Sequence, residues 1–190
     1  MQLGRRSGHA TILAVGVSLS VLLSACGTAH PSAESKSGAK ATTSSISTTP
    51  PTSSTSAEMA AVLAAYRAGW KAFEQALAIA NPADPALAAT MINPQLQGVK
   101  ANLLGDQVHG MIGRGTFTLH PKIVSLSAST ATVVDCAYST SVLLYAKTGK
   151  PVPPITPPEN DGVRAALVFT GGMWKVYKQT VTDGKCAPGS

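Results

Sequence analysis

The spacing of the apolar residues changes near Gly115, and this change limits the folds open to the chain. Before Gly115, large apolar side chains recur at intervals of three and four residues, as they do on one face of an α-helix. After it, short runs rich in β-branched and aromatic residues alternate with polar ones, as in strands. Helices followed by antiparallel strands predict an α+β fold, in which N-terminal helices pack on one face of a curved sheet.

Three helices are expected before the change. The first spans residues 56–80, and its N-cap is a serine. Asp84 and Pro85 supply an N-cap and a proline at the first helical position of a short second helix. The third is expected to begin at Pro94 and to end at Gly113. Its predicted buried stripe consists of Leu96, Val99, Leu103, Val108 and Ile112.

Five strand segments are expected after the change, separated by turns. The pair Gly171-Gly172 predicts a two-residue hairpin between the last two of them. The proline-rich segment 151–162 is expected to be a solvated hairpin connection, and the alternative is an extended recognition segment. The five segments read TFTLH, KIVSLS, ATVVDCAYSTSVLLY, VRAALVFT and MWKVYKQTV.

The N-terminal residues 1–25 have the features of an export signal. Two arginines precede an apolar stretch that is too short for a comfortable membrane span but suits a secretory signal. The stretch ends Leu23-Ser24-Ala25-Cys26, which resembles the lipobox of bacterial lipoproteins. That resemblance implies cleavage before Cys26 and acyl chains on its thiol, which would hold the protein on the extracytoplasmic face of the cell membrane. The alternative is an uncleaved anchor helix with an incidental cysteine.

Residues 26–56 are expected to form a disordered stalk, and residues 57–190 one domain. Serine, threonine, alanine and proline dominate the stalk, so it lacks the apolar surface that would offset the entropy of ordering. It is read as an unmodified tether, with O-linked glycosylation as the alternative. Removal of the two signal arginines leaves 13 basic and 9 acidic side chains, a formal charge of +4. No basic stripe interleaved with aromatics is visible, so nucleic-acid binding is not expected.

Two cysteines remain beside Cys26, namely Cys136 and Cys186. In an oxidising exported compartment, an even remainder predicts one disulfide, and the alternative is a pair of buried free thiols. A bridge that closes this loop contributes about 3–4 kcal/mol in the chain-entropy estimate. The histidines show no ligand spacing, so neither a metal nor another cofactor is expected.

The chain resembles the NTF2-like (SnoaL-type, cystatin-like cone) fold, and in particular small secreted lipoproteins of high-GC Gram-positive bacteria. The resemblance rests on three helices followed by a strand meander, and it spans nearly all of residues 57–186. Its motifs are Tyr66, Trp70 and Phe73 in the first helix, Val134-Asp135-Cys136, Thr148-Gly149-Lys150-Pro151, and Gly172-Met173-Trp174-Lys175-Val176. It implies a pocket between helices and sheet, and some members of the fold are isomerases, dehydratases or cyclases.

Proton transfer in such a cone requires an acid or base with a shifted pKa and a partner that orients it. Strand alternation places Asp135 and Tyr138 on opposite faces, so these two side chains are not expected to form a catalytic pair. Each candidate is expected to be structural or solvated, and no catalytic residue is predicted. The candidates are Asp106, His109, His120, Asp135 and Tyr138.

The predicted function is therefore a non-catalytic, membrane-anchored lipoprotein that binds a small apolar ligand or an envelope protein partner. The alternative is a surface-tethered isomerase or dehydratase that uses a histidine or aspartate of the cone. The residues expected to line the ligand pocket are Trp70, Phe73, Leu103 and Phe117.

Overall fold

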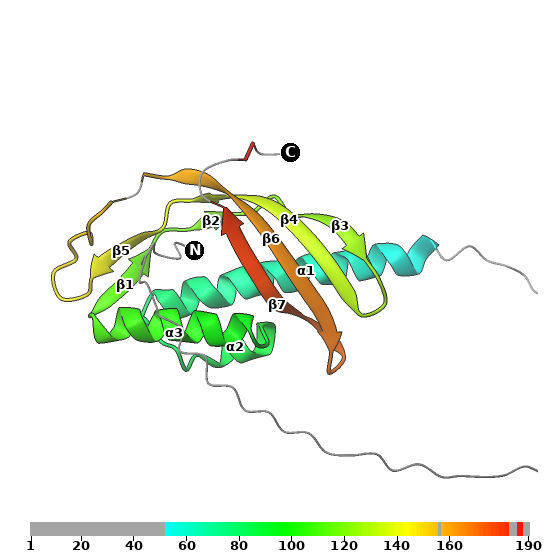
Figure 1. Ribbon diagram of the computed structural model, residues 1–190, viewed down its shortest axis with the longest axis horizontal. Coiled ribbons are helices and arrows are strands. Elements are labelled where there is room, and N and C mark those ends of the chain that lie inside the picture. Colours follow the sequence, from blue (N-terminus) through cyan, green and yellow to red (C-terminus); the bar gives the residue numbers. More distant parts are fainter. Residues whose placement is uncertain (1–51, 156, 183–185, 188–190) are drawn as a thin grey trace, which may run out of the picture. The chain divides into compact units, whose positions relative to one another are not determined.

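The computed structural model describes residues 52–155, 157–182 and 186–187. The predicted signal peptide, the lipidation candidate Cys26 and most of the predicted stalk lie outside these residues. Three helices come first in the described part, and seven strands follow them (Figure 1). The helices are α1 (Thr52–Leu77), α2 (Pro85–Thr90) and α3 (Gln95–Val108). The strands are β1 (Met111–Arg114), β2 (Phe117–Thr118), β3 (Lys122–Leu126), β4 (Thr130–Ser139), β5 (Val142–Tyr145), β6 (Glu159–Thr170) and β7 (Met173–Thr182).

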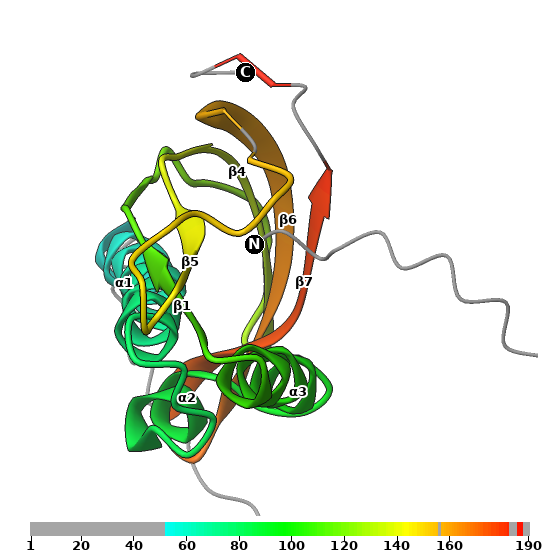
Figure 2. The same cartoon turned by 90° about the vertical axis from the view of Figure 1, so that its left-hand side faces the viewer.

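The strands form two antiparallel sheets. The larger sheet has the order β2-β4-β6-β7, and β3 pairs with β4 on the same edge as β2. The smaller sheet consists of β1 and β5. Figure 2 shows the large sheet curving around the helices, with α1 on its inner side. This arrangement confirms the α+β prediction and agrees with the NTF2-like cone that the resemblance implies.

The core lies between α1 and the inner face of the large sheet. One face of α1 buries Val62, Tyr66 and Trp70, as the three- and four-residue spacing predicts. The inner face of β4 buries alternate residues, Val133, Asp135 and Ala137. Tyr138 belongs to the opposite face and is 38% exposed, so the predicted separation of Asp135 and Tyr138 is confirmed.

The predicted end of the third helix is wrong. Helix α3 ends at Val108, and the chain turns at Gly110, whose φ of 64° is a left-handed conformation that glycine adopts at little cost. Residues Met111–Arg114 then form β1. Val108, expected in the buried stripe, is 74% exposed. The prediction failed because the helical spacing of apolar residues continues to Ile112, beyond the turn at Gly110.

Two other predicted boundaries differ. Helix α1 begins at Thr52, four residues before its predicted N-cap Ser56, and so extends into the segment assigned to the stalk. The segment expected as one long strand divides at Thr140 into β4 and β5, which belong to different sheets. The Thr140 hydroxyl accepts a hydrogen bond from the backbone N–H of Thr116. This contact joins the connection between β4 and β5 to the connection between β1 and β2.

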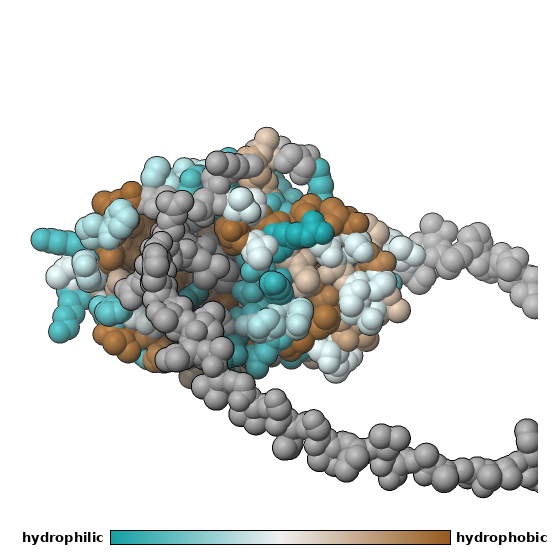
Figure 3. Space-filling model, in the orientation of Figure 1, coloured by the Kyte–Doolittle hydropathy of each residue, from teal (hydrophilic) through white to brown (hydrophobic). Residues whose placement is uncertain are grey.

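Cys136 on β4 is bonded to Cys186, with 5.7 Å between their Cα atoms. The disulfide predicted from the cysteine count is therefore present. Within the described part of the chain, no helix is both long enough and apolar enough to cross a membrane. On the face seen in Figure 3, hydrophobic residues occur in several separate patches among hydrophilic ones.

Candidate functional site

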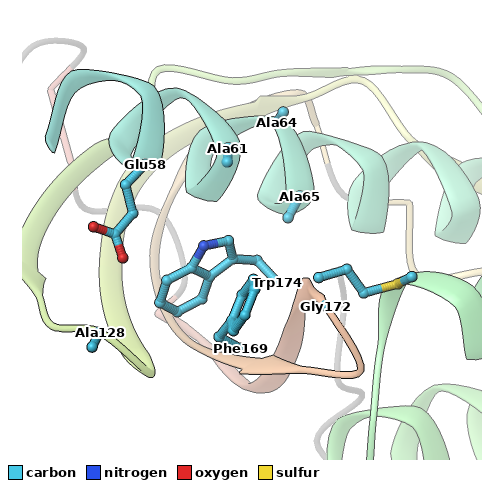
Figure 4. A pocket seen from close by; sticks show the side chains of 9 residues that line it. Glu58, Ala61, Ala64, Ala65, Ala128, Phe169, Gly172 and Trp174 are labelled. Atoms are coloured by element: carbon cyan, nitrogen blue, oxygen red, sulfur yellow. The ribbon is translucent and has the colours of Figure 1, made fainter. Parts of the chain in front are cut away.

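A pocket of about 560 Å³ lies between the first half of α1 and the tip of the β6–β7 hairpin (Figure 4). Its volume falls in the range of small-molecule sites. Helix α1 supplies one wall, the hairpin supplies the opposite wall, and the β3–β4 turn closes one side. The lining residues are Glu58, Ala61, Ala64, Ala65, Ala128, Phe169, Gly172, Met173 and Trp174.

The wall formed by the β6–β7 hairpin depends on the glycine pair 171–172, which the sequence predicts to form a two-residue turn. Gly171 and Gly172 have φ values of 59° and 77°, as a tight two-residue hairpin requires. The turn sets Phe169 directly opposite Trp174, with their ring centroids 5.5 Å apart. Trp174 is 7% exposed, whereas Phe169 is 46% exposed. The hairpin therefore presents an aromatic pair whose outer ring is open to solvent.

The helix wall is made of small side chains. Ala61, Ala64 and Ala65 line the pocket, and a methyl group at each position leaves room between α1 and the hairpin. Glu58, one turn before Ala61, is partly buried and is the single ionisable residue in the lining. Figure 4 shows its carboxylate extending toward the indole of Trp174.

The four side chains predicted to line a pocket do not line this one. Trp70, Phe73 and Leu103 are at most 6% exposed and belong to the core, and Phe117 packs against them. The ring centroids of Trp70 and Phe117 are 4.6 Å apart, and those of Phe73 and Phe117 are 6.2 Å apart. Because large aromatic rings fill space against one another, these residues close the interior, whereas alanines on the same helix leave a pocket.

A polar cluster centred on the buried side chains of Tyr66 and Asp135 lies deeper in the cone. The hydroxyl of Tyr66 donates to Asp135 Oδ2 over 2.9 Å, and the backbone N–H of His120 donates to Asp135 Oδ1 over 2.6 Å. Nδ1 of His120 lies 3.1 Å from the carbonyl oxygen of Cys136, so it is the hydrogen-bearing nitrogen. The indole nitrogen of Trp70 is buried and has no hydrogen-bond partner among the described residues. None of these four side chains lines the pocket.

Burial sets the protonation behaviour of this cluster. Desolvation raises the pKa of Asp135 above its ordinary value, although the donated hydrogen bonds oppose the shift. Desolvation, followed by the negative charge of Asp135, raises the pKa of Tyr66 well above its ordinary value. Burial is therefore the main cause of both raised pKa values.

Asp135 supplies a hydrogen-bond acceptor at a break in the edge of the large sheet. Strands β2 and β3 both pair with β4, and Pro121 lies in the break between them. The backbone N–H of His120 falls in this break, where the carboxylate of Asp135 accepts its hydrogen bond in place of a strand partner. Since Asp135 itself is buried and this part-buried N–H satisfies one of its oxygens, the contact has a structural role.

The remaining candidates do not join the cluster. His109 is the C-cap residue of α3, and Asp106 lies in the last turn of the same helix. Burial raises the pKa of Asp106, and the charge of His109 opposes the shift. Within the described ranges, no group of three or more histidine, cysteine, aspartate or glutamate side chains could hold a metal ion.

Sequence reasoning did not find the pocket or the hydroxyl bond of Tyr66. Tyr66 lies at four-residue spacing from Val62 and Trp70, in the apolar stripe of the first helix. A buried tyrosine hydroxyl needs a partner, so its place in that stripe was a signal for a polar group opposite. Glu58 gave no comparable signal, because a single acid near a helix start is common.

No protein-family model and no curated protein matches the chain. Among solved structures, the intermembrane space region of the chloroplast protein ARC6 is similar, with a TM-score of 0.51 and 13% identity over 65% of this chain and 95% of that chain. At this identity the likeness concerns the fold alone.

Two further solved structures have lower TM-scores. A putative scytalone dehydratase from Novosphingobium aromaticivorans has a TM-score of 0.46 and 16% identity, over 72% of this chain and 94% of that chain. An uncharacterised protein with a cystatin-like fold from Caulobacter vibrioides has a TM-score of 0.42 and 14% identity, over 64% of this chain and 88% of that chain.

Proposed function

We propose that this protein is a lipid-anchored, extracytoplasmic lipoprotein whose domain binds a small apolar ligand without catalysing a reaction. The observation that carries the ligand proposal is the pocket between α1 and the β6–β7 hairpin. Eight of its nine lining residues have no ionisable side chain, and four are alanines. A cavity with mostly apolar walls and one polar group is typical of a small-molecule site.

The position of the acid and base candidates supports a non-catalytic role. Asp135 is 6% exposed, and both of its oxygens accept hydrogen bonds from groups of this chain. It is not part of the pocket lining. A general base must reach the proton that it abstracts, and a carboxylate occupied in this way is better suited to holding the fold together.

The anchoring proposal is supported by the sequence. The segment Leu23-Ser24-Ala25-Cys26 follows an apolar stretch and precedes a polar, serine- and threonine-rich segment. Two or more acyl chains on one residue give durable attachment to a membrane. The disulfide agrees with an oxidising compartment.

A surface-tethered isomerase or dehydratase is the second candidate, because one observation favours it. The pKa of Asp135 is raised by burial, which moves a carboxylate toward the range in which it acts near neutral pH. This candidate predicts that Asp135→Asn or His120→Ala abolishes the physiological role while secretion and thermal stability stay unaltered. The ligand-binding proposal predicts that variants which still fold keep that role.

Binding to the pocket can be measured with N-phenyl-1-naphthylamine, a neutral probe whose fluorescence rises in apolar surroundings. Ala61→Phe adds a ring to the pocket wall and should weaken probe binding by about tenfold, or about 1.4 kcal/mol. Ala68→Phe is the matched control, because Ala68 is exposed two turns further along the same face of α1 and is not a lining residue. Equal affinity in wild type and both variants would contradict the proposal.

A further inference from the structure

We infer that the ligand of this pocket is an organic cation, with an ammonium group attached to an apolar body. This inference rests on the proposed function and names the chemical class of the ligand. It is carried by two features that the pocket brings together, an acidic side chain that forms no ion pair with a described residue and a pair of aromatic rings.

The first feature is the charge of the lining. Glu58 is the only ionisable residue among the nine, so no lysine, arginine or histidine of the lining balances it. Glu58 forms no ion pair with any residue that the structure describes. Its carboxylate extends toward the indole of Trp174 (Figure 4). An anionic ligand would lie beside this carboxylate and be repelled, whereas a cation would be attracted.

The second feature is the aromatic wall. The faces of aromatic rings carry partial negative charge and attract cations, and tryptophan does so best. Phe169 and Trp174 are tilted by 59° with their centroids 5.5 Å apart, and Glu58 lies across the pocket from them on α1. A cation between the two walls would contact the carboxylate and the rings together, while its apolar body would contact the alanines of α1.

The position of Glu58 in its helix is compatible with a cation. The positive end of a helix dipole acts mainly within the first turn. Helix α1 begins at Thr52, so Glu58 lies beyond that turn. Its charge therefore remains available to a ligand rather than serving the helix terminus.

The test compares benzyltrimethylammonium with neopentylbenzene, a neutral probe of the same shape in which carbon replaces nitrogen. Binding is measured through the tryptophan fluorescence of the full chain, with Cys26→Ala to prevent lipidation and with the disulfide formed. We expect the cation to bind at least about threefold more tightly than neopentylbenzene. Higher ionic strength should weaken the binding of the cation and not that of the neutral probe.

Two variants assign the preference to its residues. Glu58→Gln should remove the preference, because the amide side chain carries no negative charge to attract the cation. Glu159→Gln is the matched control, since it removes the same charge at the other end of β6, outside the lining, and should change neither affinity. Phe169→Leu removes a ring that is 46% exposed, and it should weaken the binding of the cation more than that of the neutral probe.

The outcomes separate this inference from the proposed function. If neopentylbenzene binds as tightly as the cation and Glu58→Gln has no effect, the pocket binds apolar ligands but the cation inference is overturned. If neither probe binds and N-phenyl-1-naphthylamine also fails, both the inference and the proposed function are overturned. A preference for the cation that Glu58→Gln leaves intact would also overturn the inference.

Discussion

The hydroxyl of Tyr66 donates a hydrogen bond to Asp135 over 2.9 Å, and this bond joins α1 to β4 across 69 positions of the chain. Tyr66 is fully buried and Asp135 is 6% exposed. The second oxygen of the same carboxylate accepts the backbone N–H of His120 at the break between β2 and β3. One buried side chain thus connects the longest helix, a central strand and an interrupted sheet edge.

Tyr66→Phe should lower the free energy of unfolding by about 1–3 kcal/mol, because Asp135 Oδ2 would be left without a donor in a buried site. Urea denaturation followed by circular dichroism measures the change. Tyr138→Phe is the control, since Tyr138 is 38% exposed on the opposite face, and it should alter stability by less than about 0.5 kcal/mol. Equal losses in the two variants would contradict the structural role of this bond.

The stability difference between wild type and Asp135→Asn should depend on pH. Because burial raises the pKa of Asp135, the folded protein keeps this proton at pH values where the unfolded chain has lost it. The contribution of this carboxyl is then full below its ordinary pKa of about 3.9 and declines as pH rises through the raised value. The wild-type free energy of unfolding minus that of the variant should therefore fall between about pH 3.5 and neutral pH.

Urea denaturation of both proteins at a series of pH values tests this slope. Asp106, whose pKa is also raised by burial, is present in both proteins and cancels in the difference. A difference that rises with pH would mean that the hydrogen bonds to Asp135 outweigh its desolvation.

Gly113→Ala should destabilise the fold by about 1–3 kcal/mol, because the added methyl group would overpack the site. A Cβ at this position would collide with Cγ of Leu77, the last residue of α1. Gly98→Ala is the matched control within α3, where an added Cβ has no heavy atom within 4 Å. It should stabilise by about 0.5–1 kcal/mol through helix propensity.

Thermal or chemical unfolding of the two glycine variants decides the comparison. Combining Gly113→Ala with Leu77→Ala should restore part of the loss that the two single changes cause together, because the smaller side chain makes room for the methyl group. Simple additivity in this double variant would show that the two residues do not collide.

Cys186→Ser should lower the free energy of unfolding by about 3–4 kcal/mol, because the unfolded chain regains the freedom that the bridge removes. The bridge between Cys136 and Cys186 closes a separation of 50 positions. A thiol reductant should bring the wild type to a similar stability and leave the variant unchanged. Full sensitivity of the variant to reductant would show that the effect has another source.

Cys26→Ala should leave an unlipidated precursor. The thiol is the attachment point that the lipobox resemblance implies, so labelled fatty acid should no longer be incorporated and the protein should not partition into detergent. The Cys186→Ser variant, which keeps Cys26, controls for loss of a cysteine as such. Unchanged labelling in Cys26→Ala would contradict the anchoring proposal.

Several features could be predicted from the sequence because they depend on neighbours along the chain. The spacing of Val62, Tyr66 and Trp70 gives the buried face of α1, and strand alternation turns Asp135 away from Tyr138. The glycine pair at 171–172 determines its hairpin, since few other residues tolerate two successive positive φ values. The cysteine count gave the disulfide because only two cysteines remained to pair.

Only the tertiary structure decided the features that join distant segments. The partner of Tyr66, the end of α3 before β1 and the pocket all depend on contacts between parts of the chain that local periodicity does not relate. Trp70 and Ala64 lie on the same helix, yet the sequence favoured the aromatic residue as a pocket wall. Close packing explains the difference at this pocket, because large side chains meet and fill the interior while small ones opposite a hairpin leave space.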